Sequence, residues 1–124
     1  MTATDDFFAE LERRGHEPML RRLSATVRWD ILDGDRIEHR LVRIDHGGVR
    51  VAVSDEPADC VIVAKRAVCD DVVTGRTSAL AALLRGAAAI DGDFEVMVLA
   101  QRLFPRTPGA VAGRAVGARG GRQA

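Results

Sequence analysis

The chain opens with apolar residues at helical spacing. Phe7, Phe8 and Leu11 repeat with a period close to 3.6 residues, which predicts an amphipathic helix. Thr4 is expected to cap its N-terminus, since two aspartates follow in what would be the first turn, and Gly15 is expected to end it.

After a second short helix, predicted to open at Glu17-Pro18, the apolar pattern changes to a period of two. Apolar and charged side chains alternate over residues 27–31, which indicates a half-buried strand, and Asp33-Gly34 is expected to form a two-residue hairpin turn. Further strands are predicted over residues 37–44, 49–53 and 60–64. Because short turns join these strands, we expect them to be largely antiparallel.

Helical signals return in the last third of the folded part. A short helix over residues 66–74 should end at Gly75, and a second, carrying three leucines and capped by Thr77 or Ser78, should end at Gly86. Residues 87–90 are too few for a helix and are predicted to form a last strand. Asp93 is expected to cap a final helix, Phe94 to Phe104, that Pro105 stops.

This order of elements predicts an α+β fold, a five-stranded, largely antiparallel sheet with helices packed on one face. The length of 124 residues suits one domain, which we place at residues 1–104. Residues 105–124 show no periodicity and are expected to be a disordered Gly/Ala/Arg tail.

The formal net charge is zero but unevenly distributed. Residues 1–104 carry all 18 acids and 14 of the 18 basic residues, and the tail carries four arginines and no acid. A solvated tail is favoured over a nucleic-acid contact because aromatic residues and dense basic runs are missing, although contact with an anionic membrane stays open. Acids beside the arginine pairs 13–14 and 21–22 likewise argue against nucleic acid.

The compartment and the cysteine chemistry are predicted together. No run reaches about 18 apolar residues and the first residues are acidic, so neither a membrane span nor a signal peptide is expected, and a cytoplasmic location is predicted. Cys60 and Cys69 should then be reduced and buried, because two cysteines nine apart match no zinc spacing. No metal and no cofactor is expected.

No catalytic constellation is visible either. His16, His39 and His46 form no pair with metal-ligand spacing, and no nucleophile motif or phosphate-binding glycine loop occurs. The Asp-x-Asp pairs at 33–35 and 91–93 are explained by a hairpin turn and by a helix cap. The sequence therefore predicts a protein that is not an enzyme.

Four segments in this order resemble the sterol carrier protein 2 (SCP-2-like) lipid-binding family. Residues 27–34 resemble its first strand and turn, 57–63 its Pro-x-Asp approach to a central strand, 71–80 the helix, glycine and helix that follow, and 85–93 its Gly-led strand ending in Gly-Asp. The resemblance covers residues 5–104. It implies an apolar tunnel between sheet and helices that takes a sterol, fatty acid or acyl-CoA-type lipid without covalent chemistry.

The function predicted from this resemblance is non-catalytic binding and carriage of such a lipid. Burying a carbon chain gives about 0.8 kcal/mol per methylene, so an apolar wall suffices to hold it. The Ala- and Arg-rich composition suggests a bacterial source. The expected lining is a set of apolar positions on the sheet and on the helices opposite: Val27, Trp29, Val61, Val63, Leu80, Leu83, Leu84, Phe94, Met97, Val98 and Phe104.

Two alternatives remain open at this point. The first is an interaction module with a closed core, for example a homodimer, since the alanines at 79, 81, 82 and 87–89 permit tight closure. The second is an accessory enzyme of steroid or acyl-CoA metabolism that uses Asp30, His39 or Asp91 as a base. That alternative requires one of these groups to face the apolar interior with a shifted pKa.

Overall fold

A long hairpin forms the centre of the sheet. The computed structural model describes residues 2–105, in which β1 (Ser24–Asp33) pairs antiparallel with β2 (Arg36–Asp45) along its whole length. The turn consists of Gly34 and Asp35, one residue later than predicted, because Asp33 still pairs with Arg36. Gly34 has a φ of 67°, a left-handed conformation that suits glycine.

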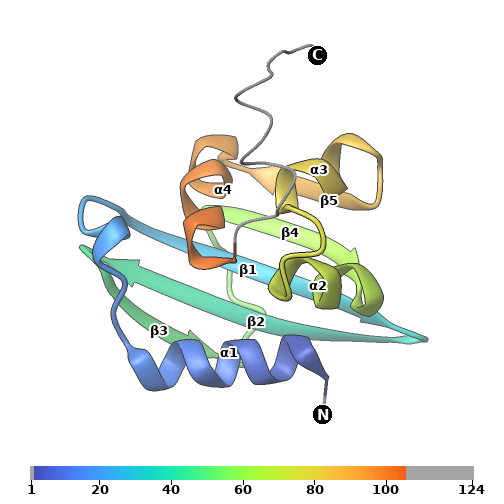
Figure 1. Ribbon diagram of the computed structural model, residues 1–124, viewed down its shortest axis with the longest axis horizontal. Helices are drawn as coiled ribbons and strands as arrows, with labels where there is room; N and C mark the ends of the chain where they lie inside the picture. The colour runs from blue at the N-terminus through green and yellow to red at the C-terminus, as the bar shows by residue number, and fades with distance from the viewer. Residues whose placement is uncertain (1, 106–124) are drawn as a thin grey trace.

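The full sheet has the order β3-β2-β1-β4-β5. Strands β3 (Gly48–Ala52), β4 (Cys60–Lys65) and β5 (Ala88–Gly92) complete it, and three of its pairings are antiparallel, which confirms the predicted class. The exception is β4, which runs parallel to β1. A parallel neighbour needs a crossover, and the segment after β3 supplies it by passing behind the sheet (Figure 1).

The crossover covers part of the sheet face that carries no helix. Arg28 on this face donates to the backbone carbonyls of Asp55 and Glu56, at 2.9 Å each. Leu41 pairs with Arg28 across the hairpin and therefore points the same way, yet it is only 1% exposed. The segment 53–59 thus lies over the part of this face that holds Arg28 and the buried Leu41.

Helix α1 (Ala3–Arg14) starts earlier than predicted. Its cap is Thr2, whose side chain accepts from the amide of Asp5 while the Asp5 carboxylate accepts from the amide of Thr2, a complete capping box. Thr4 is therefore not the cap. It lies in the first turn, buried, and its hydroxyl donates to Asp70 at 2.6 Å. Gly15 ends the helix as predicted.

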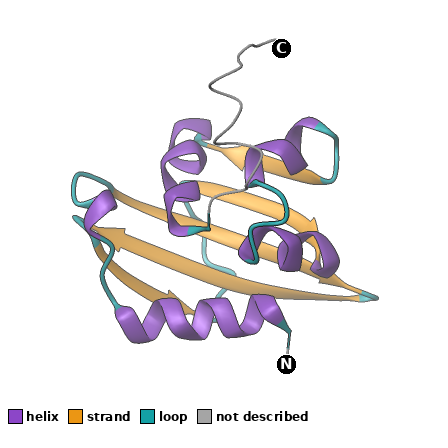
Figure 2. Cartoon of the chain, viewed as in Figure 1, coloured by secondary structure: helices purple, strands orange, loops and turns teal. Residues whose placement is uncertain are grey.

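The remaining helices are short and cover the same face of the sheet as α1 (Figure 2). They are η1 (Pro18–Leu20), α2 (Arg66–Val73), α3 (Ala79–Leu84), α4 (Phe94–Ala100) and η2 (Gln101–Leu103). Ser78 caps α3 and Asp93 caps α4. The predicted helix to Phe104 is α-helical only to Ala100 and tightens into the 3-10 turn of η2.

The core lies between the helices and the sheet. Alternate residues of β1 and β4 point into it, among them Val27, Trp29, Ile31 and Ile62. α1 packs over β3, and α2, α3 and α4 pack over β1, β4 and β5. No helix within residues 2–105 is long and apolar enough to cross a bilayer. The tail predicted to be disordered falls, from residue 106 on, outside the described residues.

Candidate functional site

An apolar cavity lies between β4, β5 and the two helices that cover them. Its volume is about 10 Å³, room for a single water molecule. The wall carries no polar side chain and consists of Ile62, Ala79, Leu83, Ala88, Ala89, Ile90 and Met97. Within residues 2–105, this cavity is too small to be the continuous tunnel that the family resemblance implies.

The structure brings part of the predicted lining to this cavity. Leu83 of α3 and Met97 of α4 are in its wall. Val27 and Trp29 are buried in the same core, on the helix-covered face of β1, and Leu80 packs against that core from α3.

Five predicted positions lie elsewhere or reach the surface. Val61 and Val63 alternate with the buried Cys60, Ile62 and Ala64, so they point to the opposite face of the sheet. The prediction placed them on the wrong face because every residue of this strand is apolar. Three helical positions have substantial solvent exposure: Leu84 at 78%, Phe94 at 48% and Val98 at 36%.

Phe104 belongs to an aromatic cluster with Phe7, Phe8 and Trp29. The centre of its ring lies 5.2 Å from that of Trp29, edge to face, and 5.1 Å from that of Phe7. Phe8 lies 6.3 Å from Trp29 and completes the group. These geometries are favourable for aromatic pairs. The end of the described chain is thereby packed against α1 and β1.

Sequence reasoning missed Ile62, Ala79, Ala88, Ala89 and Ile90. Ile62 was missed because the prediction placed its neighbours Val61 and Val63 on the inward face of β4. Ile90 was missed because residues 87–90 were predicted to form a strand without an assignment of its inward face. A usable signal existed in β5, because Asp91 is polar and Ile90 is its neighbour, which places Ile90 on the apolar face. A single sequence does not indicate whether an alanine points into the core or towards solvent.

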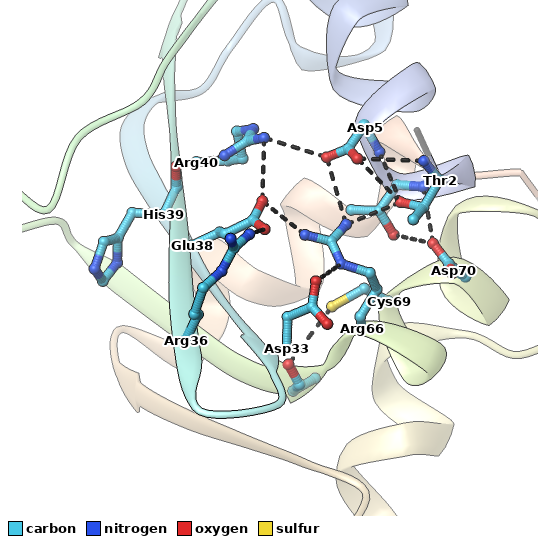
Figure 3. Close-up of polar contacts among 12 residues, drawn as sticks. Thr2, Asp5, Asp33, Arg36, Glu38, His39, Arg40, Arg66, Cys69 and Asp70 are labelled. Carbon is cyan, nitrogen blue, oxygen red and sulfur yellow. Dashed lines mark hydrogen bonds and ion pairs between the residues drawn. The ribbon is translucent and has the colours of Figure 1, made fainter.

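Polar side chains on the helix-covered side form a network near the tip of the β1–β2 hairpin (Figure 3). Arg66 begins α2 and binds Glu38 at 2.6 Å, Asp33 at 2.8 Å and Asp5 at 3.4 Å. Arg40 joins it through Asp5 at 3.2 Å. The Arg66 side chain is 11% exposed, so this network clamps α1, the central hairpin and α2 together.

The charges of the network hold its carboxylates ionised. Burial opposes ionisation of Asp5, but the amide of Thr2 and the guanidinium groups outweigh it and lower the Asp5 pKa. The hydrogen bond from Arg66 is the main reason why the pKa of Glu38 is lowered. Paired in this way, the groups are suited to structure rather than to proton transfer.

The residues named as candidate bases do not face the interior. Asp30 accepts from Arg28 at 2.9 Å and lies 2.7 Å from Nδ1 of His39, all on the face away from the helices. Burial raises the Asp30 pKa, but the hydrogen bonds from Arg28 and His39 prevail and lower it. Asp91 is exposed on the same face as Val61. The geometry required by the enzyme alternative is thus not met by these three groups.

Two further features bear on chemistry. Desolvation raises the pKa of Cys60 to about 11 and that of Cys69 to about 12, so both thiols stay protonated. Within residues 2–105, no three His, Cys, Asp or Glu side chains gather as metal ligands would.

A larger groove lies between α1 and β3, with a volume of about 490 Å³. Its floor includes Phe8 and Val51, but its walls carry Asp5, Glu12, Glu38 and Arg40. Four charged residues make it a poor match for an apolar ligand.

Solved structures share this fold. The sterol carrier protein 2 of Aedes aegypti, solved in complex with palmitate, has a TM-score of 0.66 at 20% identity, over 82% of this chain and 94% of that chain. A possible sterol carrier protein of Thermus thermophilus gives 0.60 at 17%, over 82% and 78%. The SCP2 protein UbiJ of ubiquinone synthesis gives 0.60 at 19%, over 81% and 90%.

Comparison with curated proteins gives no match. The sequence nevertheless matches the SCP-2 sterol transfer family over residues 8–105, which include every strand and all of the elements around the apolar cavity. The match agrees with the resemblance read from the four sequence segments. This chain therefore belongs to the SCP-2 sterol transfer family.

Proposed function

We propose that the protein binds a lipid between the sheet and helices α3 and α4, and carries it without chemical change. The observation that carries this proposal is the cavity wall of seven apolar residues, in a chain that belongs to the SCP-2 sterol transfer family. Lipid carriage needs apolar surface and few polar anchors. A relative of the same fold was solved with palmitate, which supports an acyl chain as one class of ligand.

The closed cavity means that the ligand must make its own space. Helix α3 has six residues and is followed by Gly86 in a left-handed conformation, with a φ of 79°. Such a short helix has few contacts to lose when it moves away from β5. Each methylene buried returns about 0.8 kcal/mol, so a long chain can offset this opening.

The small cavity also favours a second candidate, an interaction module whose core stays closed. On this alternative the domain takes no ligand, and its exposed apolar residues, such as Leu84 and Phe94, contact a partner or a second copy. With the carrier function we also propose that the protein is not an enzyme, that it comes from a bacterium, that it is cytoplasmic and that it contacts membranes transiently.

Solvent extraction and titration separate the two candidates. The purified full chain is extracted with organic solvent, the extract is analysed by mass spectrometry, and the protein is titrated with cis-parinaric acid and with dehydroergosterol. The carrier function predicts a co-purified lipid or saturable binding of one probe. If no lipid co-purifies and neither probe saturates in the micromolar range, the carrier function is contradicted and the interaction module is favoured. Light scattering would then show whether the protein is a dimer.

A matched pair of variants locates the binding. Leu83→Trp fills the cavity wall and should weaken probe binding about tenfold, since an added ring competes directly with the ligand. Leu84→Trp adds the same ring at a position 78% exposed and should leave binding within twofold. Equal effects of the two variants would contradict a site at this cavity.

A further inference from the structure

A second groove adjoins the apolar cavity at the end of β4. It lies between the N-terminal end of α2 and the turn that leads from α3 into β5. Both segments are at the right of Figure 1. Its volume is about 450 Å³, within the range of small-molecule sites. Ala88 and Ala89 line both this groove and the cavity, so the two spaces share a wall at the start of β5.

The groove is apolar except at one residue. Its lining comes from both faces at the end of β4: Ala64 and Ala88 belong to the helix-covered face, and Val63 and Ala89 belong to the opposite face. Leu32, Val68 and residues 86–87 complete the walls. The remaining lining residue is Lys65, which is the only lysine among the 18 basic residues of the chain. A wall of this kind suits a hydrocarbon chain that carries one charged end.

The charge at this end of the groove is positive and unengaged. Lys65 is exposed, and within residues 2–105 no carboxylate lies at ion-pair distance from it. The nearest acid along the hairpin, Asp33, is held by Arg66 at 2.8 Å. Lys65 also precedes the first turn of α2, which carries no acid and has no side-chain cap, so the helix dipole adds potential of the same sign.

We propose that this groove is the mouth of the lipid site and that Lys65 binds the anionic head of a single-chain amphiphile. The head would pair with the ammonium group while the chain passes Ala88 and Ala89 towards Ile62 and Met97. This inference rests on the proposed function and narrows its ligand class to ionised fatty acids and acyl compounds with an anionic head. Neutral sterols lack the group that Lys65 would recognise.

Calorimetric titration of the full chain with decanoate and with decanol tests the head-group contact. The wild-type protein should bind the anion more tightly than the alcohol. Lys65→Gln should weaken decanoate binding roughly fivefold, the upper range for an exposed ion pair, and leave decanol within about twofold. Arg102→Gln removes one exposed positive charge from η2, outside the groove, and should change neither affinity.

A second pair of variants tests the path of the chain. Ala89→Phe places a ring in the groove at an exposed position and should weaken both ligands about tenfold, since it occupies the volume that the chain needs. Ala81→Phe adds the same ring on the exposed side of α3 and should have no effect. Circular dichroism confirms that each variant is folded.

The outcomes separate this inference from the proposed function. If decanoate or decanol binds and its affinity is unchanged in Lys65→Gln and Ala89→Phe, the groove is not the mouth of the site. The proposal of lipid carriage would still stand. Binding of dehydroergosterol with no binding of decanoate would overturn the anionic ligand class. Failure of every lipid to bind would overturn both proposals together.

Discussion

Gly92 lies where β5 ends, and its backbone leaves no room for a side chain. Its φ is 103°, and a Cβ built there would come within 2.3 Å of the Asp59 carbonyl oxygen. The amide of Asp93 donates to that same carbonyl at 2.8 Å. At the scale of a single residue, a glycine therefore lets the strand that lines the cavity join the helix that covers it.

Gly92→Ala should destabilise the domain by about 2–3 kcal/mol, because strain and a backbone clash combine. Urea unfolding followed by circular dichroism measures the loss. Gly34→Ala is the control, since Gly34 also has a positive φ of 67° but nothing within 4 Å of the added Cβ. It should cost about 1 kcal/mol. Equal losses in the two variants would contradict the close contact with Asp59.

The two cysteines should be inert in the folded protein. Both are buried, and their raised pKa values leave almost no thiolate at neutral pH. Reaction with a disulfide reagent such as Ellman's reagent should be slow in buffer and complete within minutes in concentrated urea. A fast native reaction of either thiol would show that its part of the core opens readily.

Residue-level errors in the sequence-based predictions have a common cause. Thr2 and Thr4 are equally good caps by residue type, and only the Thr2-x-x-Asp5 spacing distinguishes them. The hairpin turn was predicted one residue early for a similar reason, since Asp33 is acceptable both in a turn and at a strand end. Local chemistry finds an element but leaves its boundary uncertain by a residue or two.

At the scale of elements, Arg66 connects three segments that are distant in the sequence. It binds Asp5 of α1 and both ends of the β1–β2 hairpin tip, Asp33 and Glu38. Nothing in the sequence pairs these residues, because their contact depends on how α1 and α2 pack over the sheet. Burial of the arginine makes the network sensitive to the loss of its centre.

Arg66→Met should cost about 2–3 kcal/mol, since it leaves three carboxylates close together without their shared cation. Arg36→Met is a matched control, because Arg36 also binds Glu38, at 3.1 Å, but is 71% exposed. Its loss should stay within about 0.5 kcal/mol. Chemical denaturation at neutral pH compares the two. A similar loss in both variants would contradict the clamp.

The same network predicts how stability depends on pH. The folded-state pKa values of Asp5 and Glu38 are lowered, so their contribution is complete above the unfolded-state values and is lost as the pH falls through the folded ones. The free energy of unfolding should therefore decline below about pH 4.5, and the decline should be smaller in Arg66→Met. If the free energy of unfolding of Arg66→Met declines with pH as steeply as that of the wild type, the network is not the source of the acid sensitivity.

Strand β4 shows where element-level prediction fails. Its existence and span were predicted within one residue, yet its inward face was not, because residues 60–64 are apolar throughout. β4 lies between β1 and β5, and Val61 and Val63 are half-buried on the face that carries no helix, so apolar residues occupy both faces of the strand and no polar residue alternates with them. The cavity residues on β4 therefore required the pairing register, which three-dimensional structure alone provides.

At the scale of the whole molecule, the fold class was predictable and the state of the site was not. Periodicity, turn residues and four family-like segments were enough for the five-stranded sheet with helices on one face. The tunnel was not predictable, because the space between layers depends on how closely α3 and α4 approach β5. Alanines at 79, 82 and 88 allow that approach and leave only a small cavity.

The two halves of the domain are held together by different interactions. Charged clamps fix α1 and α2 to the central hairpin, and the half that contains α3, α4 and β5 is held mainly by apolar contacts. Apolar contacts are not directional, so this half can separate and close again at little cost in unpaired groups. The account therefore assigns lipid binding to the α3–α4–β5 half.

Methyl chemical shifts on addition of decanoate test this central claim most directly. Protein labelled at Ile, Leu and Val methyl groups is titrated and followed by NMR. The largest changes are expected at Ile62, Leu83 and Ile90, which line the cavity, with small changes at Val49 and Val51 under α1. Saturable binding that shifts the Val49 and Val51 methyls and leaves the cavity methyls unchanged would contradict the account, as would the absence of any shift.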